Sequence, residues 1–449
     1  MAGRIFGTDG VRGLANVDLT AELALDLSVA AAHVLGGVGA FTGSRPFAVV
    51  GRDPRASGEF LEAAVIAGLA SAGVDVHRLG VLPTPAVAHL TAARGADLGV
   101  MLSASHNPMP DNGLKFLAAG GNKLADTLED AIEARLRDPW SRPTGERVGR
   151  VTDDTAAMAD YVDHLAATVD APFDGISMVF DAANGAASVA GPVLLRRLGA
   201  ELTAIHDQPD GLNINDNCGS THLGSLIAKV RETGADLGIA VDGDADRCLA
   251  VDATGDVVDG DQILAILALA RKAKGTLTRN TVVATVMSNL GLGKAMAAGG
   301  IEVRRTKVGD RYLLEEMKSG GYELGGEQSG HVIMLDHATT GDGLLAAIQV
   351  IAEMVRTGQS LRDLAGVMAK FPQVLVNVPG VDKTRCDTDP TVAAAVAAAT
   401  AQLGDSGRVL LRPSGTESLV RVMVEAGTGT QAQSVADRLA SVVSSALRL

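Results

Sequence analysis

Three aspartates spaced two residues apart carry the clearest chemical signal in this chain. Asp242, Asp244 and Asp246 lie in the segment DGDADR, directly after an apolar run at 237–241 that predicts a strand. Carboxylates this close together repel one another, and a divalent cation with hard oxygen ligands removes the repulsion. The EF-hand is excluded, because its sixth loop position requires Gly and this chain has Arg247 there. We therefore expect Mg²⁺ at this loop, with a solvated acidic loop as the alternative.

A serine-rich loop follows the apolar strand expected at 98–102. The loop reads SASHNP and contains Ser103 and Ser105, and Lys115 follows a turn expected at 111–113. In open α/β sheets, ligands bind at the sheet edge where such loops lie. A turn whose Ser and Asn side chains satisfy its own backbone is the alternative. Beside a bound Mg²⁺, Ser105 suits the nucleophile of a phosphoryl transfer.

Four further loops carry groups that suit a phosphorylated sugar. The first loop, FGTDGVRG, has glycines that would let an oxyanion approach closely; an ordinary turn is the alternative. The second, GEQSGH, offers groups that could form hydrogen bonds to a polyol; a polar turn is the alternative. TKVGDR and the hairpin RPSGT supply cations, and Arg with hydroxyl and backbone N–H groups holds phosphate dianions. In chain order, the candidate residues in these loops are Arg12, Lys307, Glu327, Ser329, His331, Arg412, Ser414, Gly415, Thr416 and, on the return strand, Arg421.

The elements that must position these loops repeat along the chain. A unit of strand, small polar loop, helix and strand begins near residues 47, 177 and 281. This repetition predicts three related α/β domains, and after Pro372 the pattern changes to that of an α+β domain. We therefore expect domains at residues 1–160, 161–262, 263–370 and 371–449, each contributing one chemical loop.

Local signals set the bounds of several elements. Ser57 has the character of an N-cap, and we expect a helix from Gly58 to Gly73 after it. In the last domain we expect a helix at 390–403 and a final helix at 431–447. The cationic hairpin should connect two strands of that domain, so that its turn is exposed to a ligand.

Composition and charge exclude several classes of protein. The chain has 449 residues, too many for one core, and its net charge of −14 argues against nucleic-acid and anionic-membrane partners. Cys218, Cys248 and Cys386 form no CxxC pair and are typical of reduced thiols. No apolar run has the length of a membrane span, and no signal peptide is evident. We expect a cytoplasmic protein whose oligomeric state is open, with a homodimer among the possibilities.

Four motifs spread over the whole chain resemble those of the α-D-phosphohexomutase superfamily. They are ASHNP at 104–108, DGDADR at 242–247, GEQSGH at 326–331 and RPSGTE at 412–417. Within the superfamily, GTDGVRG, SASHNP and LNINDNCGSTH are similar to the bacterial phosphoglucosamine mutase family. A phosphomannomutase/phosphoglucomutase of the same superfamily is the alternative, since no residue by itself shows how a 2-amino group is recognised.

The resemblance implies interconversion of glucosamine 6-phosphate and glucosamine 1-phosphate, feeding UDP-N-acetylglucosamine synthesis. Ser105 would carry the phosphoryl group, and a sugar 1,6-bisphosphate would be both intermediate and activator. One Mg²⁺ would bind Asp242, Asp244, Asp246 and the phosphoryl group on Ser105.

The resemblance also implies an architecture and further roles. Three mixed-sheet α/β domains and a TBP-like C-terminal α+β domain would surround a central cleft. Glu327 and Ser329 would bind sugar hydroxyls, and Arg412, Ser414, Gly415 and Thr416 would clamp a phosphate. Acid–base work, or steadying of the phosphoryl group, would fall to Arg12, Lys115, Arg247 and His331.

Overall fold

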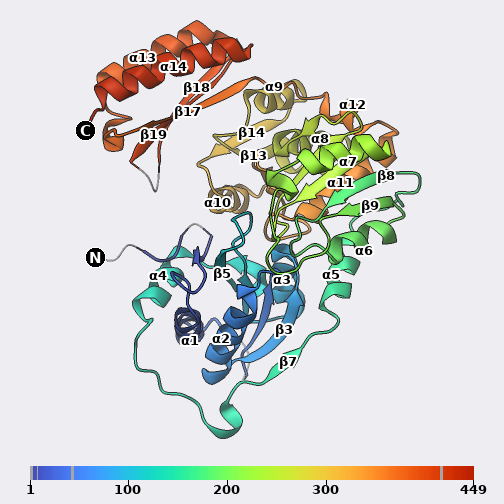
Figure 1. Ribbon diagram of the computed structural model, residues 1–449, viewed down its shortest axis with the longest axis vertical. Coiled ribbons are helices and arrows are strands. Elements are labelled where there is room, and N and C mark those ends of the chain that lie inside the picture. The colour runs from blue at the N-terminus through green and yellow to red at the C-terminus, as the bar shows by residue number, and fades with distance from the viewer. Residues whose placement is uncertain (1–3, 8, 42–44, 415–417) are drawn as a thin grey trace. The chain divides into compact units, whose positions relative to one another are not determined.

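The computed structural model describes residues 4–7, 9–41, 45–414 and 418–449. The chain divides into two compact units, each described by itself below (Figure 1). The large unit comprises residues 1–286 and 302–365, and the small unit comprises residues 287–301 and 366–449. Among the described residues, no helix is both long enough and apolar enough to cross a membrane.

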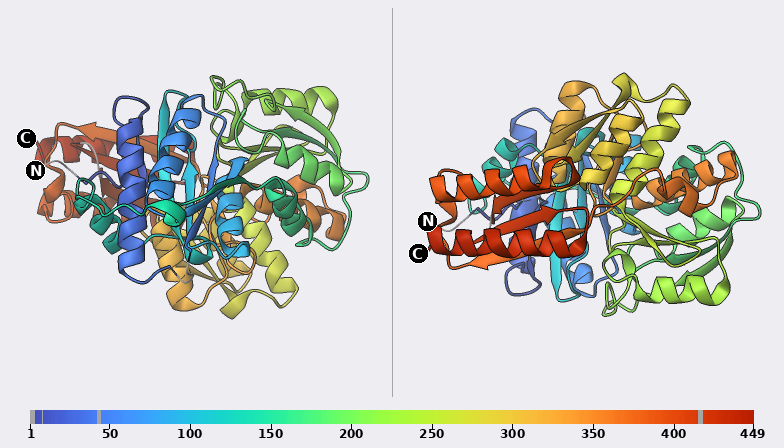
Figure 2. Two further views of the ribbon diagram at one scale, coloured as in Figure 1. Left: turned by 90° about the horizontal axis from the view of Figure 1, so that it is seen from below. Right: turned by 90° about the horizontal axis from the view of Figure 1, so that it is seen from above.

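The first sheet of the large unit has seven strands in the order β1-β5-β4-β2-β3-β7, with β6 paired to β5. Strands β2, β3, β4 and β7 are parallel, and β5 joins antiparallel to β4 and β1. Apolar side chains of α1 and α2, which lie side by side in Figures 1 and 2, form one core with β2 and β4. The elements are β1 (Val11–Leu14), α1 (Ala21–Gly37), β2 (Phe47–Arg52), α2 (Ser57–Ser71), β3 (Asp75–Val81), α3 (Thr84–Ala93), β4 (Leu98–Leu102), β5 (Asp111–Ala118), β6 (Asn122–Lys123), α4 (Asp126–Ala134) and β7 (Val151–Asp153).

The second sheet has five strands in the order β12-β11-β10-β8-β9. Its central strand β10 is buried along its whole length, parallel to β8 and antiparallel to β11. The loop between β10 and β11 therefore starts at the end of a buried strand, where its side chains leave the core. The elements are α5 (Ala157–Ala166), β8 (Ser177–Asp181), α6 (Ala190–Arg197), β9 (Glu201–Ile205), α7 (Gly224–Thr233), β10 (Leu237–Val241), β11 (Cys248–Asp252) and β12 (Val257–Val258).

The third sheet of the large unit has four strands in the order β14-β13-β15-β16. The buried strand β13 is parallel to β14 and β15, and the antiparallel pair β15–β16 presents a short loop between its strands. The elements are α8 (Gly260–Ala273), β13 (Thr281–Thr285), β14 (Glu302–Thr306), α10 (Asp310–Gly320), β15 (Leu324–Gly326), β16 (Val332–Met334), α11 (Gly343–Thr357) and α12 (Leu361–Ala365).

The small unit is an antiparallel sheet in the order β17-β19-β18 with helices packed on it. Helices α13 and α14 lie side by side (Figures 1 and 2) and share one apolar core with the sheet. The elements are α9 (Leu290–Ala298), β17 (Gln373–Pro379), α13 (Pro390–Leu403), β18 (Arg408–Pro413), β19 (Leu419–Glu425) and α14 (Gly429–Ala446).

The expected fold class is confirmed: three mixed α/β sheets are followed by an α+β domain. Two local expectations are wrong. Asp111–Gly113 is not a turn but the start of β5, because pairing with the N-terminal strand β1 extends the ladder to Asp111. Ser57 does not cap α2 from outside; α2 begins at Ser57, and the hydroxyl of Ser57 accepts a hydrogen bond from Asn112 (2.9 Å).

Candidate active site

Ser105 lies in the loop between β4 and β5 and points at the aspartate cluster. Its side chain is buried, and its Oγ donates a hydrogen bond to Asp242 Oδ2 (2.6 Å). Its backbone N–H donates to Ser103 Oγ (2.9 Å). The φ angle of Ser105 is +53°, in the left-handed region that a residue other than Gly rarely adopts. Strained backbone of this kind clusters at functional sites, where the surroundings hold it in place.

Asp242, Asp244 and Asp246 form a compact carboxylate cluster in the loop after β10. All three are buried, and one oxygen of each lies within 4.8 Å of the others. Burial, and then the charges of Asp246 and Asp244, raise the pKa of Asp242 to about 8. Asp244 Oδ1 and Asp246 Oδ1 are buried and have no hydrogen-bond partner within the described parts of the chain. Unsatisfied carboxylate oxygens facing one another fit a hard divalent cation.

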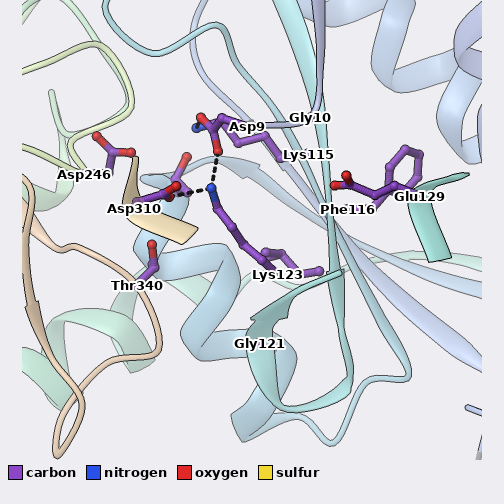
Figure 3. Close-up of a pocket in the computed structure, with 12 residues that line it drawn as sticks. Asp9, Gly10, Lys115, Phe116, Gly121, Lys123, Glu129, Asp246, Asp310 and Thr340 are labelled. Carbon is purple, nitrogen blue, oxygen red and sulfur yellow. Dashed lines mark hydrogen bonds and ion pairs between the residues drawn. The ribbon is translucent and has the colours of Figure 1, made fainter. Parts of the chain in front are cut away.

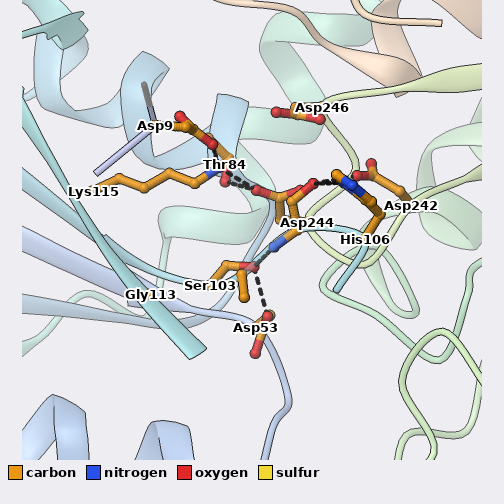
Figure 4. A network of polar contacts seen from close by, with 12 residues as sticks. Asp9, Asp53, Thr84, Ser103, His106, Gly113, Lys115, Asp242, Asp244 and Asp246 are labelled. Atoms are coloured by element: carbon orange, nitrogen blue, oxygen red, sulfur yellow. Dashed lines mark hydrogen bonds and ion pairs between the residues drawn. The ribbon is translucent and has the colours of Figure 1, made fainter. Parts of the chain in front are cut away.

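Lys115 joins this cluster to the N-terminal loop (Figure 4). Its Nζ lies 2.8 Å from both Asp244 Oδ2 and Asp9 Oδ2, and Asp244 Oδ2 also accepts from Thr84 Oγ1 (2.6 Å). Burial alone would lower the pKa of Lys115, but the charges of Asp244 and Asp9 outweigh it and raise the pKa. Lys115 is therefore a permanent cation at neutral pH.

The chain of ion pairs continues from Asp9 to the third sheet. Lys123 Nζ lies 2.7 Å from Asp9 Oδ1 and also pairs with Asp310 at the start of α10, as Figure 3 shows. Arg12 pairs with Asp9 as well. These charges link residues from the first, second and third sheets, so ion pairs hold together the loops that carry the candidate residues; the Lys115–Asp244 pair is buried and the others are partly buried.

The loop between β15 and β16 brings the expected sugar-binding residues near the aspartates. Glu327 Oε1 accepts from the Gly309 N–H (3.2 Å), and Ser329 Oγ lies 3.5 Å from Glu327 Oε2. His331 Nδ1 lies 3.6 Å from Asp246 Oδ2, whereas its buried Nε2 has no hydrogen-bond partner among the described residues. Burial would lower the pKa of His331, but Asp246 outweighs it and raises the pKa to about 9.

A cavity of about 390 Å³ adjoins these loops within the large unit. Its volume lies in the range of small-molecule sites. Its lining includes candidates from all three sheets: Arg12, Asp246, Arg247, Glu327 and His331. Cations, carboxylates and an imidazole around one small cavity suit a charged and hydroxylated ligand.

Some expected residues do not line this cavity, and others fall outside the described residues. Lys307 is exposed, and its ammonium group lies 5.8 Å from the centre of the Tyr312 ring. Gly415 and Thr416 fall outside the described residues. In the small unit, Ser414 follows the end of β18.

The cationic hairpin of the small unit places two arginines opposite each other on neighbouring strands. Arg412 on β18 is the direct partner of Arg421 on β19 in the antiparallel ladder. Burial, and then the charge of Arg421, lower the pKa of Arg412. Neighbouring cations repel one another, and an anion bound between them would remove that repulsion.

Several residues of this network were not predicted from the sequence. They are Asp9, Thr84, Lys123 and Asp310, and also Asp53 and Arg55 in the loop after β2. The segment GRDPR, charged and directly after a buried strand, was a usable signal for the last two. The lysine partners of Asp9 lie far from it in the chain, and Asp310 lies far from Lys123, so no local pattern indicated these pairs.

One other group of the described residues gathers three possible metal ligands within 4.8 Å, namely Asp181, His206 and Cys218. Asp181 already accepts from the N–H groups of Ala183 (2.9 Å) and Gly219 (3.1 Å), and His206 Nδ1 lies 3.0 Å from it. Burial raises the pKa of Cys218 to about 12, so the thiol keeps its proton. We interpret this group as structural: it holds the chain that leaves β8.

Comparison with known proteins agrees with this arrangement. Residues 3–141, 159–255 and 259–371 match the models of phosphoglucomutase/phosphomannomutase α/β/α domains I, II and III, and residues 375–442 match the C-terminal domain model. A solved phosphoglucomutase/phosphomannomutase family protein from Burkholderia thailandensis superposes with a TM-score of 0.82 at 24% identity, covering 99% of this chain and 98% of that one. The fold is that of the α-D-phosphohexomutase superfamily.

Relatives with higher sequence identity show which family of this superfamily the chain belongs to. A phosphoglucosamine mutase from Acidothermus cellulolyticus is 67% identical over 440 residues, covering 98% of this chain and 95% of that protein. A phosphoglucosamine mutase from Nocardioides sp. is 66% identical over 446 residues, covering 99% of this chain and 100% of that protein. The chain belongs to the phosphoglucosamine mutase family.

Proposed function

We propose that this protein is a mutase that interconverts glucosamine 6-phosphate and glucosamine 1-phosphate in the cytoplasm. The name and near full-length identity of its relatives support the substrate. The observation that carries the mechanism is the hydrogen bond from Ser105 Oγ to Asp242, within a cluster whose other carboxylates have unsatisfied oxygens. We propose that four domains, at residues 1–160, 161–262, 263–370 and 371–449, each contribute one loop to the reaction.

Ser105 is the proposed carrier of the phosphoryl group. A free sugar hydroxyl attacks the phosphorus, the bond from phosphorus to Ser105 Oγ breaks, and a glucosamine 1,6-bisphosphate results. The bisphosphate turns around and returns its other phosphoryl group to Ser105, which completes the isomerisation. The same bisphosphate, supplied in trace amounts, serves as the activator that loads Ser105.

His331 is the proposed site of proton transfer. Its Nε2 has no hydrogen-bond partner among the described residues and its ring lines the cavity. Lys115 is tied to two carboxylates and keeps its proton, so it is assigned to electrostatic support of the cluster. The pKa of His331 lies nearer the working pH than that of Lys115, so the neutral fraction of His331 accepts the proton of the attacking sugar hydroxyl and returns it to Ser105 Oγ when the bond to phosphorus breaks.

Asp242, Asp244 and Asp246, with a phosphoryl oxygen on Ser105, are the proposed ligands of one Mg²⁺. The unsatisfied oxygens of the cluster and the raised pKa of Asp242 fit a divalent cation. When bound, Mg²⁺ supplies positive charge that offsets the charge of the transferring phosphoryl group. Lys115 and Arg247 add fixed positive charge around the same carboxylates.

The remaining candidates are proposed to hold the sugar phosphate. Glu327 accepts hydrogen bonds from sugar hydroxyls, and Ser329 can donate or accept them. Both can do so in either orientation of the sugar, which the reorientation of the bisphosphate requires. Arg12, Arg247 and Lys307 attract the anionic substrate. The distal phosphate is proposed to bind Arg412, Ser414, Gly415, Thr416 and Arg421 in the small unit, where two adjacent guanidinium groups favour an anion.

The test is a comparison of kcat/KM for the 6-phosphates of glucosamine, glucose and mannose, with Mg²⁺ and a trace of sugar bisphosphate. A clear preference for the amino sugar supports the proposal. Equal or better turnover of the neutral sugars assigns the protein to the phosphomannomutase/phosphoglucomutase group instead. Phosphate release without isomerisation contradicts a mutase altogether.

A further inference from the structure

Arg55 is a fully buried cation beside the Ser105 loop. It lies between β2 and α2, is 0% exposed, and does not belong to the described residues that line the cavity. A guanidinium is buried at low cost only when it is paired and its N–H groups are hydrogen-bonded. The partners of Arg55 therefore show what this buried charge holds in place.

The partners of Arg55 are one carboxylate and four backbone carbonyl groups. Its Nε donates to Asp53 Oδ2 (2.9 Å), which forms a buried ion pair. The planar guanidinium directs its other N–H groups along fixed directions, so each carbonyl must lie at a set place. Nη1 donates to the oxygens of Pro108 (2.5 Å) and Asp111 (3.0 Å), and Nη2 donates to those of Ser105 (3.0 Å) and Asn107 (2.8 Å).

The same carboxylate also fixes the other side of Ser105. Asp53 Oδ2 accepts from Ser103 Oγ (2.6 Å), and Ser103 Oγ accepts from the Ser105 N–H (2.9 Å), as Figure 4 shows in part. Arg55 thus holds the carbonyl of Ser105 directly, together with Asn215 Nδ2 (2.9 Å), while Asp53 holds its N–H through Ser103. A residue other than glycine keeps a φ of +53° only when contacts on both sides of it fix its backbone, as they do for Ser105.

We infer that Arg55 is a positioning residue for phosphoryl transfer, which sets the backbone of residues 105–111 so that Ser105 Oγ faces Asp242. The inference rests on the proposed role of Ser105 as phosphoryl carrier. A phosphorylated Ser105 carries about −1.5 to −2 charge beside three carboxylates, so the loop must resist being pushed away. Arg55 touches neither the reacting atoms nor the aspartate cluster, and acts through the loop alone.

The test is Arg55→Lys, which keeps the positive charge but replaces the planar fork by one ammonium group. A displacement of about 1 Å at a reacting group costs about 100-fold in rate, so kcat should fall by about that factor. KM for glucosamine 6-phosphate should change by less than about threefold, because Arg55 makes no contact with the substrate cavity. The single-turnover rate of transfer from phosphorylated Ser105 to the sugar should fall in parallel with kcat.

Arg45→Lys is the control for the exchange of arginine for lysine, at a side chain that is 47% exposed. Arg45 also donates hydrogen bonds to one carboxylate, that of Asp75, and to two backbone carbonyls, those of Glu146 and Val148. These partners do not belong to the Ser105 loop. The kcat of Arg45→Lys should equal that of the unmodified protein. If Arg55→Lys instead lowers only the melting temperature and leaves kcat per folded molecule unchanged, Arg55 is structural and the inference is wrong.

Two more variants separate the possible failures. Ser103→Ala removes the bridge from Asp53 to the Ser105 N–H without altering a charge, and should lower kcat about tenfold at constant KM even if Arg55→Lys does not fold. Normal turnover of Ser103→Ala would contradict the inference. Ser105→Ala must be inactive; if it turns over substrate, the proposed function fails. An inactive Ser105→Ala together with fully active Arg55→Lys overturns the positioning role alone.

Discussion

Replacing Lys115 by Met tests how strongly the aspartate cluster depends on its built-in cation. The Lys115 ammonium is buried and lies 2.8 Å from both Asp9 and Asp244. At an effective dielectric constant of about 20, each contact is worth about 6 kcal/mol by Coulomb's law. Desolvation of the ammonium offsets much of this, and removing one partner of a buried ion pair costs about 3–5 kcal/mol in unfolding free energy.

The loss should depend on Mg²⁺. Without the ammonium, the carboxylates of Asp9 and Asp244 face each other with less compensation, and a bound divalent cation then relieves more repulsion than in the unmodified protein. Because a ligand that binds the folded state stabilises it, Mg²⁺ should raise the melting temperature of Lys115→Met more than that of the unmodified protein. The two proteins should therefore differ most in EDTA and least at saturating Mg²⁺.

Calorimetry in EDTA and in Mg²⁺ measures both effects. We expect the melting temperature of Lys115→Met in EDTA to fall by about 4–7 °C. Lys229→Met is the control, since Lys229 pairs at the surface with Glu232 and such pairs contribute about 0–1 kcal/mol. An unchanged melting temperature in EDTA, or an equal Mg²⁺-induced rise in the melting temperatures of Lys115→Met and the unmodified protein, would contradict this prediction.

Three further predictions concern neighbouring groups. Thr84→Val removes the hydroxyl that donates to Asp244 (2.6 Å), and should weaken Mg²⁺ affinity about tenfold in a titration of activity against Mg²⁺. Glu327→Gln keeps the shape of the loop but weakens its hydrogen bonds to sugar hydroxyls, so steady-state kinetics should show KM for glucosamine 6-phosphate raised about tenfold; an unchanged KM would exclude Glu327 from binding. Burial, and then the charge of His164, lower the pKa of His89 to about 4 in the folded protein. Between about pH 6.5 and pH 4 the unfolded chain therefore binds a proton at His89 that the folded protein does not bind, and the free energy of unfolding falls as the pH drops through this range. His89→Phe, which keeps the ring stacked on His164, should flatten that fall in urea-unfolding midpoints, and an identical pH dependence would contradict the assignment.

The parts of the site that follow buried strands were predictable from the sequence. Strands β4 (Leu98–Leu102) and β10 (Leu237–Val241) have the expected bounds, because each is an uninterrupted apolar run between polar loops. The side chains that leave such strands reach the same edge of their sheets. The contact between Ser105 and Asp242 agrees with that reasoning, although their sequence separation of 137 residues carries no local signal.

The rest depended on tertiary pairing. Asp111–Gly113 has turn-like residues, yet its pairing with β1 makes it a strand, since a sheet ladder outweighs a local preference. Ser57 has an N-cap residue type, but its hydroxyl accepts a hydrogen bond from Asn112 on strand β5. Lys123 gave no sequence signal, because its significance lies in contacts with Asp9 and Asp310, which are distant along the chain.

The fate of the phosphoryl group on Ser105 tests the account most directly. The protein would be charged with radiolabelled sugar 1,6-bisphosphate, freed of excess reagent, and mixed with unlabelled glucosamine 6-phosphate. We expect label on Ser105 alone, none on Ser105→Ala, and transfer of the label to a glucosamine bisphosphate. Label on another residue, or its release as inorganic phosphate without transfer to the sugar, would contradict the account.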